Sequence, residues 1–405
     1  MRVSGPDAFA VARAVAGVEP LPGRVRFCRF GDFDEGLLLA FKAPHSYTGE
    51  DVAELQCHGG TVSPRRVLEA CFAAGARLAR NGEFTCRAFL NGKMDLSEAE
   101  AVIELVDAKT DRAADDALAR LGGERRRRYA GVYDAALALS ADVEHSLDVD
   151  EGELPDGFLE SVSARAHELS AALSAALSAA RGGRMLRSGA LVVIAGPPNA
   201  GKSSLLNALV GESRAIVSDE PGTTRDAIEA WLDVDGWPVR LVDTAGLRKA
   251  DSAVEAEGVR RAKRLVEDAD VVVALGEDAP EGAKGRLIFV QAKCDIVPPS
   301  QGGARLRTSA VTGEGIAALK AAIASALDEL AGEGGKADCR TTPSEREIAL
   351  LTAALAESKL AEAAGDVVLV AGHLGKCAQS IGQTIGAVYS DDLLTAIFSR
   401  FCVGK

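Results

Sequence analysis

The sequence lacks the features that define several protein classes. It has no apolar run approaching the ~20 residues of a membrane span and no apolar signal core at its N-terminus, so we expect a soluble protein without a membrane anchor. Its eight cysteines are scattered without the paired spacing of a zinc site, which makes zinc improbable and favours reduced thiols in a cytoplasmic protein.

Positive charge is also scarce. The chain has 46 Lys and Arg against 59 Asp and Glu, a formal net charge of -13. Phosphate contacts require clustered Lys and Arg, so an acidic chain is a poor nucleic-acid binder by itself. We interpret the compact basic run Arg125–Arg128 as a solvated helix face. If the protein acts on a nucleic acid, we expect a partner protein to supply many of the binding contacts.

The 405 residues are 47% hydrophobic and 26% charged, which is globular and too long for one ordinary core. Residues 1–92 alternate strand-like and helical runs, which predicts an N-terminal α/β domain. Residues 93–189 and 331–405 are dominated by helical periodicity and predict one helical domain in two segments. Residues 190–330 alternate short strands with helices, as in a parallel sheet. We therefore predict a nucleotide-binding domain inserted into a helical one.

A phosphate-binding loop opens the inserted domain. Gly196–Ser203 reads Gly-Pro-Pro-Asn-Ala-Gly-Lys-Ser and lies between a buried-strand candidate and a helix. The backbone N–H groups of the loop and the positive helix N-terminus suit a polyphosphate. We expect Lys202 to reach the β- and γ-phosphates and Ser203 to bind Mg²⁺.

Two downstream segments complete a triphosphate site. Pro221–Asp226 is a loop with adjacent hydroxyls, of which Thr224 is expected to complete the Mg²⁺ shell and to order the loop when γ-phosphate is present. A plain turn is the alternative. Asp243–Gly246 follows a strand: Asp243 suits the outer Mg²⁺ shell, and Gly246 lets a backbone N–H approach the γ-phosphate.

A guanine-reading pair lies further along, at Lys293–Asp295 and Ser309–Ala310. The Asp295 carboxylate can accept from guanine N1–H and the exocyclic amine, a pattern that adenine does not offer, so we predict GTP rather than ATP. Ala292 replaces the usual Asn of this motif. The loss of one hydrogen bond, worth about 0.5–1.5 kcal/mol, predicts weaker affinity with guanine preference retained.

Catalysis departs from the usual pattern at Leu247, which occupies the position where other GTPases carry the Gln that orients the attacking water. A leucine side chain has no group for that role. The sequence alone leaves Glu255, Glu257 and Asp251 as candidate carboxylates. No arginine finger is identifiable from the spacing, so a cation can fill that electrostatic role.

Blocks outside these motifs resemble the tRNA-uridine modification GTPase family (MnmE or TrmE) over nearly the whole chain. They are Pro44–Gln56 with His58–Gly60, Gly82–Thr85, Arg87–Leu96 and Phe401–Lys405. The resemblance implies an N-terminal α/β domain that binds folate and makes a homodimer, a central helical domain and an inserted Ras-like P-loop GTPase domain. Family members carry a further segment ahead of the part that begins here at Arg2. We therefore expect a late recorded start or a truncated form, which bears on the folate pocket and the dimer rather than on the GTPase.

The resemblance also assigns residues to a folate site. By motif matching, Arg2, Glu54, Lys93 and Lys405 fall on positions that contact a tetrahydrofolate derivative, in its 5,10-methylene or 5-formyl form. Arg and Lys suit a glutamyl carboxylate, and Glu suits the N–H donors of the pterin. Cys402 matches the family's C-terminal Cys, either as a functional thiol or as a packed free thiol.

In the GTPase domain the resemblance implies a potassium ion between two copies of that domain. Asn199 would bind it, with further oxygens from Ser218, Glu220 and Thr223. Glu255 matches the water-orienting carboxylate and, with Lys202, forms the predicted catalytic pair. The predicted GTP-binding residues are Asn199, Ala200, Gly201, Lys202, Ser203, Ser204, Ser218, Asp219, Glu220, Pro221, Gly222, Thr223, Thr224, Asp243, Thr244, Ala245, Gly246, Lys293, Asp295, Ser309 and Ala310.

The leading hypothesis is a K⁺-stimulated GTPase of tRNA modification. The resemblance implies a partner of the MnmG (GidA) type that uses FAD and NADH, and a carboxymethylaminomethyl or aminomethyl product at C5 of the wobble uridine. A regulatory GTPase of ribosome assembly is one alternative, but the acidic helical flanks offer no RNA-binding module. A folate-dependent aminomethyl transferase would leave the P-loop without a purpose. Ala292 gives some weight to a scaffold with a degenerate nucleotide site.

Overall fold

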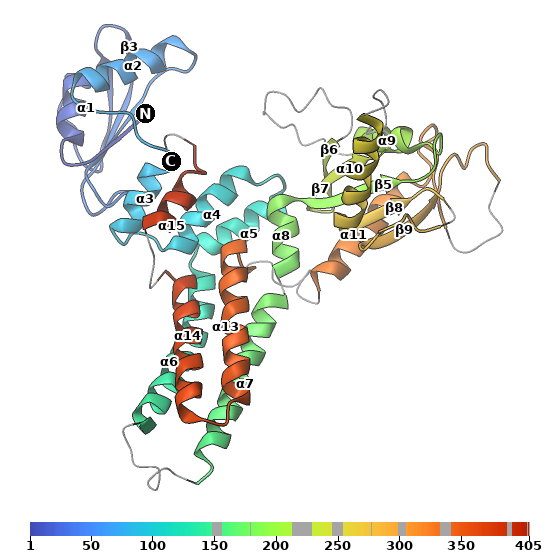
Figure 1. Cartoon of the computed structure of the whole chain (residues 1–405). Coiled ribbons are helices and arrows are strands. Elements are labelled where there is room, and N and C mark those ends of the chain that lie inside the picture. Colours follow the sequence, from blue (N-terminus) through green and yellow to red (C-terminus); the bar gives the residue numbers. More distant parts are fainter. Residues whose placement is uncertain are drawn as a thin grey trace. The chain divides into compact units, whose positions relative to one another are not determined.

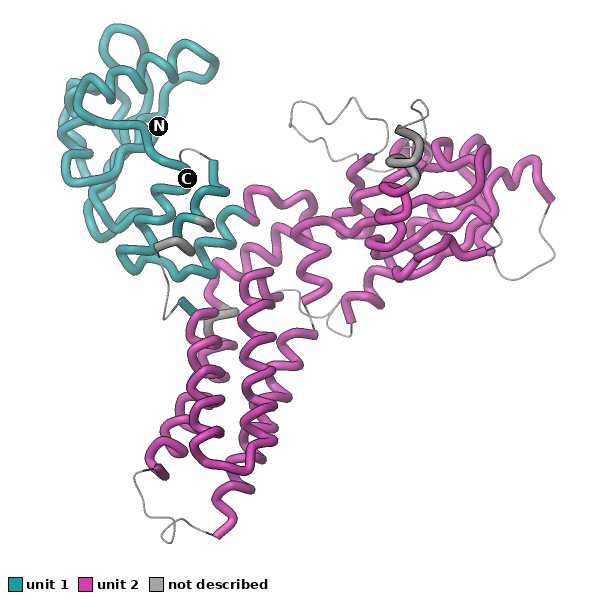
Figure 2. Tube along the Cα trace, viewed as in Figure 1, with its two compact units in different colours: residues 1–103, 385–405 teal, residues 104–384 magenta. Residues whose placement is uncertain are grey.

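The computed structural model describes residues 1–147, 156–178, 180–212, 229–244, 254–276, 278–298, 305–332, 342–386, 391–402 and 404. These residues form two compact units, coloured separately in Figure 2: residues 1–103 with 385–405, and residues 104–384. The predicted layout of several α/β and helical parts is confirmed, whereas the predicted domain boundaries stay predictions. No helix in the described ranges has both the length and the apolar character to cross a membrane.

The first unit contains a four-stranded antiparallel sheet in the order β1-β4-β3-β2 (Figure 1). Its elements are β1 (Arg2–Ser4), α1 (Ala8–Ala16), β2 (Val25–Phe30), β3 (Asp34–Phe41), β4 (Val52–Gln56) and α2 (Val62–Ala73). Side chains alternate between the two faces of a strand, so every second residue can face the same core. Leu38 and Leu55 therefore pack with Val11 of α1 and Val67 of α2.

A second core in this unit joins distant parts of the chain. It is formed by α3 (Glu83–Leu90), the first part of α4 (Leu96–Asp107) and α15 (Asp391–Phe398). Phe89, Leu96, Phe398 and Phe401 are its buried side chains. Residues 96–103 and 391–402, which the sequence places in the helical domain, thus pack with α3.

The second unit contains a four-helix bundle (Figure 1). Its helices are α6 (Glu124–Leu147), α7 (Phe158–Ser178), α13 (Glu345–Ala363) and α14 (Val367–Thr384). Val143, Val162, Ala361 and Leu374 fill the core. Helix α13 begins at a capping box, in which the Ser344 side chain accepts from the Glu347 N–H and Glu347 accepts from the Ser344 N–H.

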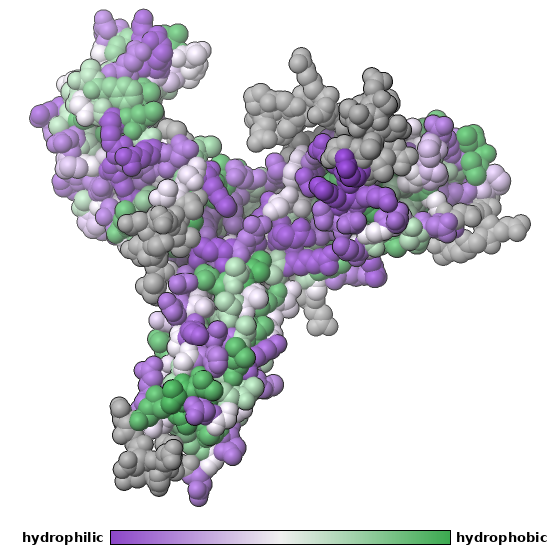
Figure 3. Space-filling model, viewed as in Figure 1, coloured by the Kyte–Doolittle hydropathy of each residue, from purple (hydrophilic) through white to green (hydrophobic). Residues whose placement is uncertain are grey.

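Apolar side chains are also exposed near the connection between α13 and α14. They are Leu360, Val368 and Leu369, which are at least half exposed, and Figure 3 shows apolar surface along this bundle. Hydrophobic residues are common on protein surfaces, so exposure alone assigns them no role.

The remainder of the second unit is built on a six-stranded sheet in the order β10-β9-β8-β5-β7-β6. Its strands are β5 (Ala190–Ala195), β6 (Glu229–Val234), β7 (Trp237–Asp243), β8 (Val271–Ala274), β9 (Arg286–Gln291) and β10 (Leu306–Arg307). All neighbours are parallel except β6, which is antiparallel to β7. Central β5 is buried throughout, as a strand of a covered parallel sheet should be.

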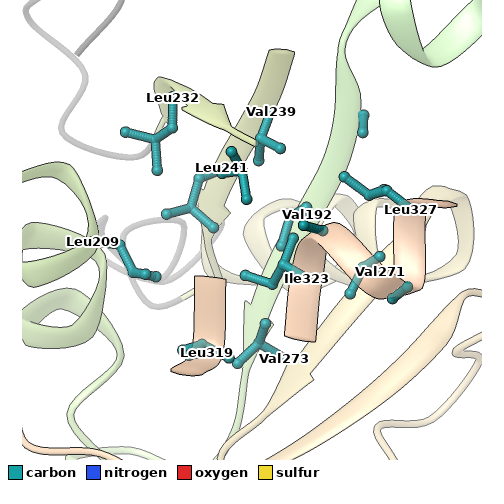
Figure 4. Packing of buried hydrophobic residues seen from close by; sticks show 14 of the residues in the cluster. Val192, Leu209, Leu232, Val239, Leu241, Val271, Val273, Leu319, Ile323 and Leu327 are labelled. Atoms are coloured by element: carbon teal, nitrogen blue, oxygen red, sulfur yellow. The ribbon is translucent and has the colours of Figure 1, made fainter. Parts of the chain in front are cut away.

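Helices cover the two faces of this sheet unequally. One face packs against α8 (Ala180–Ser188), α9 (Lys202–Glu212) and α11 (Ile316–Ala331), and Figure 4 shows Val192, Leu241 and Ile323 within that core. The other face packs against α10 (Val254–Asp268) through Val266, and Ala269, which follows the helix, belongs to the same core. The described residues between β8 and β9 contain no helix, although parallel neighbours are usually joined by one.

The chain enters and leaves this sheet domain at neighbouring points. Helix α8 precedes β5, and its Gly182 lies against Ala331 at the end of α11, where an added Cβ would be 3.0 Å from the Ala331 Cβ. A side chain at Gly183 would overlap Thr342. Arg187 at the end of α8 donates to the Pro343 carbonyl at 2.7 Å. The first and last parts of the domain are thereby held together.

Candidate nucleotide-binding site

The phosphate loop connects the buried strand β5 to helix α9. Its backbone needs glycine at two points, since Gly196 has φ of 157° and Gly201 has φ of 97°. A Cβ on Gly196 would lie 2.6 Å from the carbonyl oxygen of Leu275, which follows β8. Asn199 also has a left-handed φ of 62° and is exposed at the tip of the loop. The loop therefore turns back on itself so that α9 starts at Lys202.

Lys202 points back into this loop. It is 6% exposed, and its ammonium donates to the carbonyl oxygens of Gly196 at 2.9 Å and Pro197 at 2.7 Å. The Ala200 N–H donates to the Pro197 carbonyl at 3.4 Å. A positive charge is thus held against the loop, where the oxygens of a polyphosphate would bind.

The next residue, Ser203, contacts a neighbouring strand. Its hydroxyl donates to Oδ2 of Asp243 at 2.5 Å, and Asp243 is 2% exposed at the end of β7. The Thr244 hydroxyl and N–H both donate to the Ile194 carbonyl, at 3.1 and 3.4 Å, because β5 and β7 are paired neighbours. A hydroxyl beside a carboxylate is an all-oxygen donor set, which is the type that Mg²⁺ prefers. Ser204 follows on the exposed side of α9.

The guanine-side loops lie at the ends of β9 and β10. The Lys293 ammonium donates to the Asn199 carbonyl at 2.8 Å and so reaches the phosphate loop. The Cys294 N–H donates to the Thr308 carbonyl at 3.0 Å, which ties the two guanine-side loops together. Asp295 is exposed beside this contact.

Ser309 in the second guanine-side loop is fully buried, and its hydroxyl accepts from the N–H groups of Val311 and Thr312 at 3.3 and 3.2 Å. Ala310 is half-buried in the same turn. The hydroxyl therefore fixes the turn in which Ala310 lies, and its own oxygen is engaged by backbone.

Ala292 lies between the two halves of the site. It is half-buried and packs against the core of the sheet domain. Its Cβ is 3.8 Å from the position that a Cβ would take on Gly201, so its methyl group faces the phosphate loop. An apolar group therefore stands where the usual motif has an amide.

Several predicted residues lie outside the described part of the chain. They are Ser218, Asp219, Glu220, Pro221, Gly222, Thr223, Thr224, Ala245, Gly246 and Lys405. Glu255 is within the bounds of α10, but its side chain is also outside the description. Among the remaining predicted residues, the structure brings the phosphate-side and guanine-side groups together at the carboxyl ends of β5, β7 and β9, where ligands of parallel sheets bind.

A cavity of about 570 Å³ adjoins the phosphate loop and was missed by sequence reasoning. Its lining includes Pro197 of the loop, Leu275 after β8 and Lys263 of α10. Lys263 and Glu281 form an ion pair of 2.8 Å, which lowers the pKa of the exposed Glu281 carboxyl. No local motif marks these residues, because the order of the strands brings them together.

The predicted folate residues are placed in two groups. Arg2 and Glu54 face each other in the β1–β4 register, and Nε of Arg2 donates to Glu54 at 2.8 Å. The Arg2 guanidinium also lies 4.9 Å from the centre of the Tyr47 ring. Arg2 lines a cavity of about 450 Å³, whereas Glu54 and Lys93 are not among its described lining residues. The exposed Lys93 donates to the Pro44 carbonyl at 3.1 Å.

Cys402 is exposed, and its carbonyl accepts from the Gly82 N–H at 3.5 Å. This contact positions the backbone of the C-terminal segment beside α3. The exposure of the Cys402 side chain argues against a closely packed thiol.

The chain is similar to known proteins along its whole length. Residues 1–93 match the family described as the GTP-binding protein TrmE N-terminus, and residues 96–402 match the MnmE helical domain. The tRNA modification GTPase MnmE of Neisseria gonorrhoeae is 41% identical over 433 residues, covering 100% of this chain and 95% of the relative. The protein of the same name from Symbiobacterium thermophilum is 41% identical over 450 residues, covering 100% and 96%.

Among solved structures, the FeoB G-domain of Methanococcus jannaschii is 25% identical, covers 34% of this chain and 97% of its own length, and has a TM-score of 0.25, a likeness too low to carry an argument. The family matches and the full-length relatives decide the assignment. The chain belongs to the MnmE (TrmE) family.

Proposed function

We propose that the chain hydrolyses GTP and that this hydrolysis serves tRNA modification. The observation that carries the proposal is the convergence of three groups on one loop: the Lys202 ammonium, the Ser203–Asp243 pair and the Lys293–Asn199 pair. Membership of the MnmE family supports the link to tRNA, since the full-length relatives are named tRNA modification GTPases.

Each described residue has a chemical task in this proposal. Lys202 lies against the loop and would neutralise charge on the β- and γ-phosphates. Ser203 and Asp243 would hold Mg²⁺, which when bound screens the charge of the transferring phosphoryl group. The Asp295 carboxylate would accept from guanine N1–H and the exocyclic amine.

We also propose that potassium supplies the positive charge that an arginine finger supplies elsewhere. Asn199 supports this because its exposed side chain is at the tip of the phosphate loop. Ser218, Glu220, Thr223 and the water-orienting Glu255 remain predictions of the family resemblance. The ion would lie between the GTPase domains of two chains.

The folate and the partners also rest on the family resemblance. Arg2 supports a folate site, since its guanidinium lines a cavity, where a cation suits the glutamyl carboxylate of the ligand. The proposed partners are a second copy of the chain, a subunit of the MnmG type with FAD and NADH, and tRNA. The proposed product is a carboxymethylaminomethyl or aminomethyl group at C5 of the wobble uridine.

The GTPase proposal is tested with purified chain in K⁺ and Na⁺ at equal ionic strength. We expect hydrolysis that is faster in K⁺ and is lost in Lys202→Ala. Lys284→Ala, which changes an exposed lysine outside the site, should keep the parent rate. A rate indifferent to the cation would remove the potassium proposal, and no hydrolysis in either salt would favour a degenerate nucleotide site.

The tRNA proposal needs a separate measurement. Mass analysis of tRNA nucleosides from a strain lacking the gene should show wobble uridines without the C5 group. Restoring the gene should restore the modification, and the Lys202→Ala gene should not. Unchanged wobble uridines in the deletion strain would contradict the role in modification.

A further inference from the structure

Both tryptophans of the chain lie on the β6–β7 hairpin, and each faces a cation from the segment around the start of α5 (Asp111–Leu121). The Lys109 ammonium is 4.7 Å from the centre of the Trp231 ring, and the Arg112 guanidinium is 4.0 Å from that of Trp237. Cations over indole faces at such distances attract the ring electrostatically. The segment around the start of α5 therefore contacts the hairpin at two points.

Arg112 is held in place by more than the ring. The Thr110 side chain caps α5 by accepting from the Ala113 N–H at 3.3 Å, which fixes the first turn of the helix. Gly236, with φ of 82°, forms the turn of the hairpin, and a Cβ there would lie 3.2 Å from the Arg112 Cβ. The backbone of the hairpin thus approaches the arginine closely.

A carboxylate on α11 completes the contact. Oδ1 of Asp328 accepts from the indole N–H of Trp237 at 3.1 Å and from Nη1 of Arg112 at 3.4 Å. Trp237 is fully buried, so its N–H requires this partner. Arg112, Trp237 and Asp328 form one cluster, which we call the indole clamp, from α5, β7 and α11.

The indole clamp and the nucleotide site are at opposite ends of one strand. β7 begins at Trp237 and ends at Asp243, whose carboxylate accepts from the Ser203 hydroxyl at 2.5 Å. Six of its seven residues are buried, and it is paired on both sides, by β5 and β6. A strand of seven residues spans about 20 Å, so the clamp acts at a distance from the chemistry.

The same hairpin joins two segments whose sequences carry motifs of the predicted triphosphate site. Residues 213–228, with the Pro221–Asp226 motif, precede β6, and residues 245–253 follow β7 and Thr244. Any change in the position of β7 along its axis would alter the Ser203–Asp243 pair. Because the strand is buried and closely packed, a shift at one end is expected to be transmitted to the other end.

We propose that Arg112 is a positioning residue for GTP hydrolysis, acting through Trp237 and β7 on Asp243. This inference rests on the proposed GTPase function. Arg112 belongs to the helical segment before the sheet domain, so the indole clamp also makes hydrolysis responsive to the placement of α5. Since phosphate and base are bound by other residues, the clamp influences turnover more than nucleotide affinity.

The test compares Arg112→Met with the parent and with Arg286→Met. Arg286 is a matched control, because it also pairs with a carboxylate of α11, Glu329 at 2.5 Å, but lies on β9, which is not a neighbour of β7 in the sheet. We expect kcat for GTP to fall roughly 2–30-fold in Arg112→Met, with KM little changed, as for residues that couple to a site without contacting it. Arg112→Lys should recover part of kcat, and Arg286→Met should match the parent.

Fluorescence separates positioning from folding. In a Trp231→Phe background the emission reports Trp237 alone, and it should differ between Mg²⁺·GDP and a non-hydrolysable GTP analogue. Arg112→Met should abolish that difference while the far-UV circular dichroism stays that of the parent. A kcat equal to the parent's, or an unchanged fluorescence difference, would overturn the inference. Absence of hydrolysis by the parent would instead contradict the proposed function.

Discussion

The ammonium of Lys293 donates to the carbonyl oxygen of Asn199 at 2.8 Å and joins the guanine-side loop to the phosphate loop. Both residues have left-handed backbone conformations, with φ of 59° and 62°, which non-glycine residues rarely adopt. Strained conformations persist where the surroundings hold them in place, and such residues cluster at ligand sites. We infer that the base and phosphate halves of the site are organised together.

Removal of that contact should weaken nucleotide binding. Lys293→Met is expected to lower GDP and GTP affinity about tenfold, the low end for a charged hydrogen bond, because Lys293 is exposed. Titration with a fluorescent guanine nucleotide measures the change. Lys284→Met serves as the control and should bind as tightly as the parent. Equal affinity in the two variants would show that the contact does not organise the site.

Ala292 offers a gain-of-affinity experiment. Ala292→Asn restores the amide of the usual guanine motif, and the new hydrogen bond should tighten GTP binding by about 0.5–1.5 kcal/mol, roughly 2–13-fold. The methyl group already faces the phosphate loop beside Gly201, so the amide would be directed into the site. ATP binding, measured in the same titration, should not improve. A parallel gain for ATP would mean that the amide does not read guanine.

A stability prediction concerns Arg120, which is buried in the second unit. Its side chain is 0% exposed and pairs with Glu104 and, at 2.7 Å, with Asp116. Arg120→Ala should lower the free energy of unfolding by about 3–5 kcal/mol, since it leaves the buried Asp116 carboxylate without its cation. Urea denaturation followed by circular dichroism measures the loss.

The control for Arg120 is Arg165→Ala, because Arg165 and its partner Asp142 are both about half exposed. Arg165→Ala should lower the free energy of unfolding by no more than about 1 kcal/mol, as for surface ion pairs in general. Similar losses in the two variants would show that burial does not govern the strength of these pairs.

The pH dependence of stability should reflect Glu83 in the first unit. Arg77 and Arg87 both donate to its carboxylate, and the hydrogen bond from Arg77 is the largest cause that lowers the pKa of Glu83 from 4.5 to about 2. A depressed folded pKa gives stabilisation that is complete above pH 4.5 and is lost as the pH falls toward 2. Glu83→Gln should remove this part of the pH dependence in urea denaturation between those values. If the free energy of unfolding depended on pH in the same way in the parent and in Glu83→Gln, the prediction would be refuted.

The phosphate site was the most predictable part of the molecule, because its residues are contiguous. Lys202 and Ser203 follow directly from a loop that joins a strand to a helix, and the structure places them at that junction. The approach of Leu275 to Gly196 was not predictable in this way, because it depends on β8 lying beside β5. The absence of a helix between the described ends of β8 and β9 likewise contradicts the general expectation for parallel neighbours.

Long-range polar contacts were the least predictable. Arg2 and Glu54 were selected through family resemblance, but their hydrogen bond arises from the β1–β4 register across 52 residues. The indole clamp was missed altogether. Arg112 reads as an ordinary exposed position in the first turn of a helix, and only the fold brings Asp328 to it.

The two ends of the sheet domain lie close together, at the contacts of α8 with the end of α11 and with the residues before α13. Gly182 lies against Ala331, and Arg187 donates to the Pro343 carbonyl, so the N- and C-terminal boundaries of the sheet domain are adjacent. We call the sheet domain between these two boundaries the GTPase cassette. Domain insertion and exchange are tolerated where the ends of a domain lie close together. A GTPase cassette from a relative could therefore be transplanted at these boundaries without separating α7 from α13. The reciprocal graft would place this cassette, with its Ala292, in a different helical host.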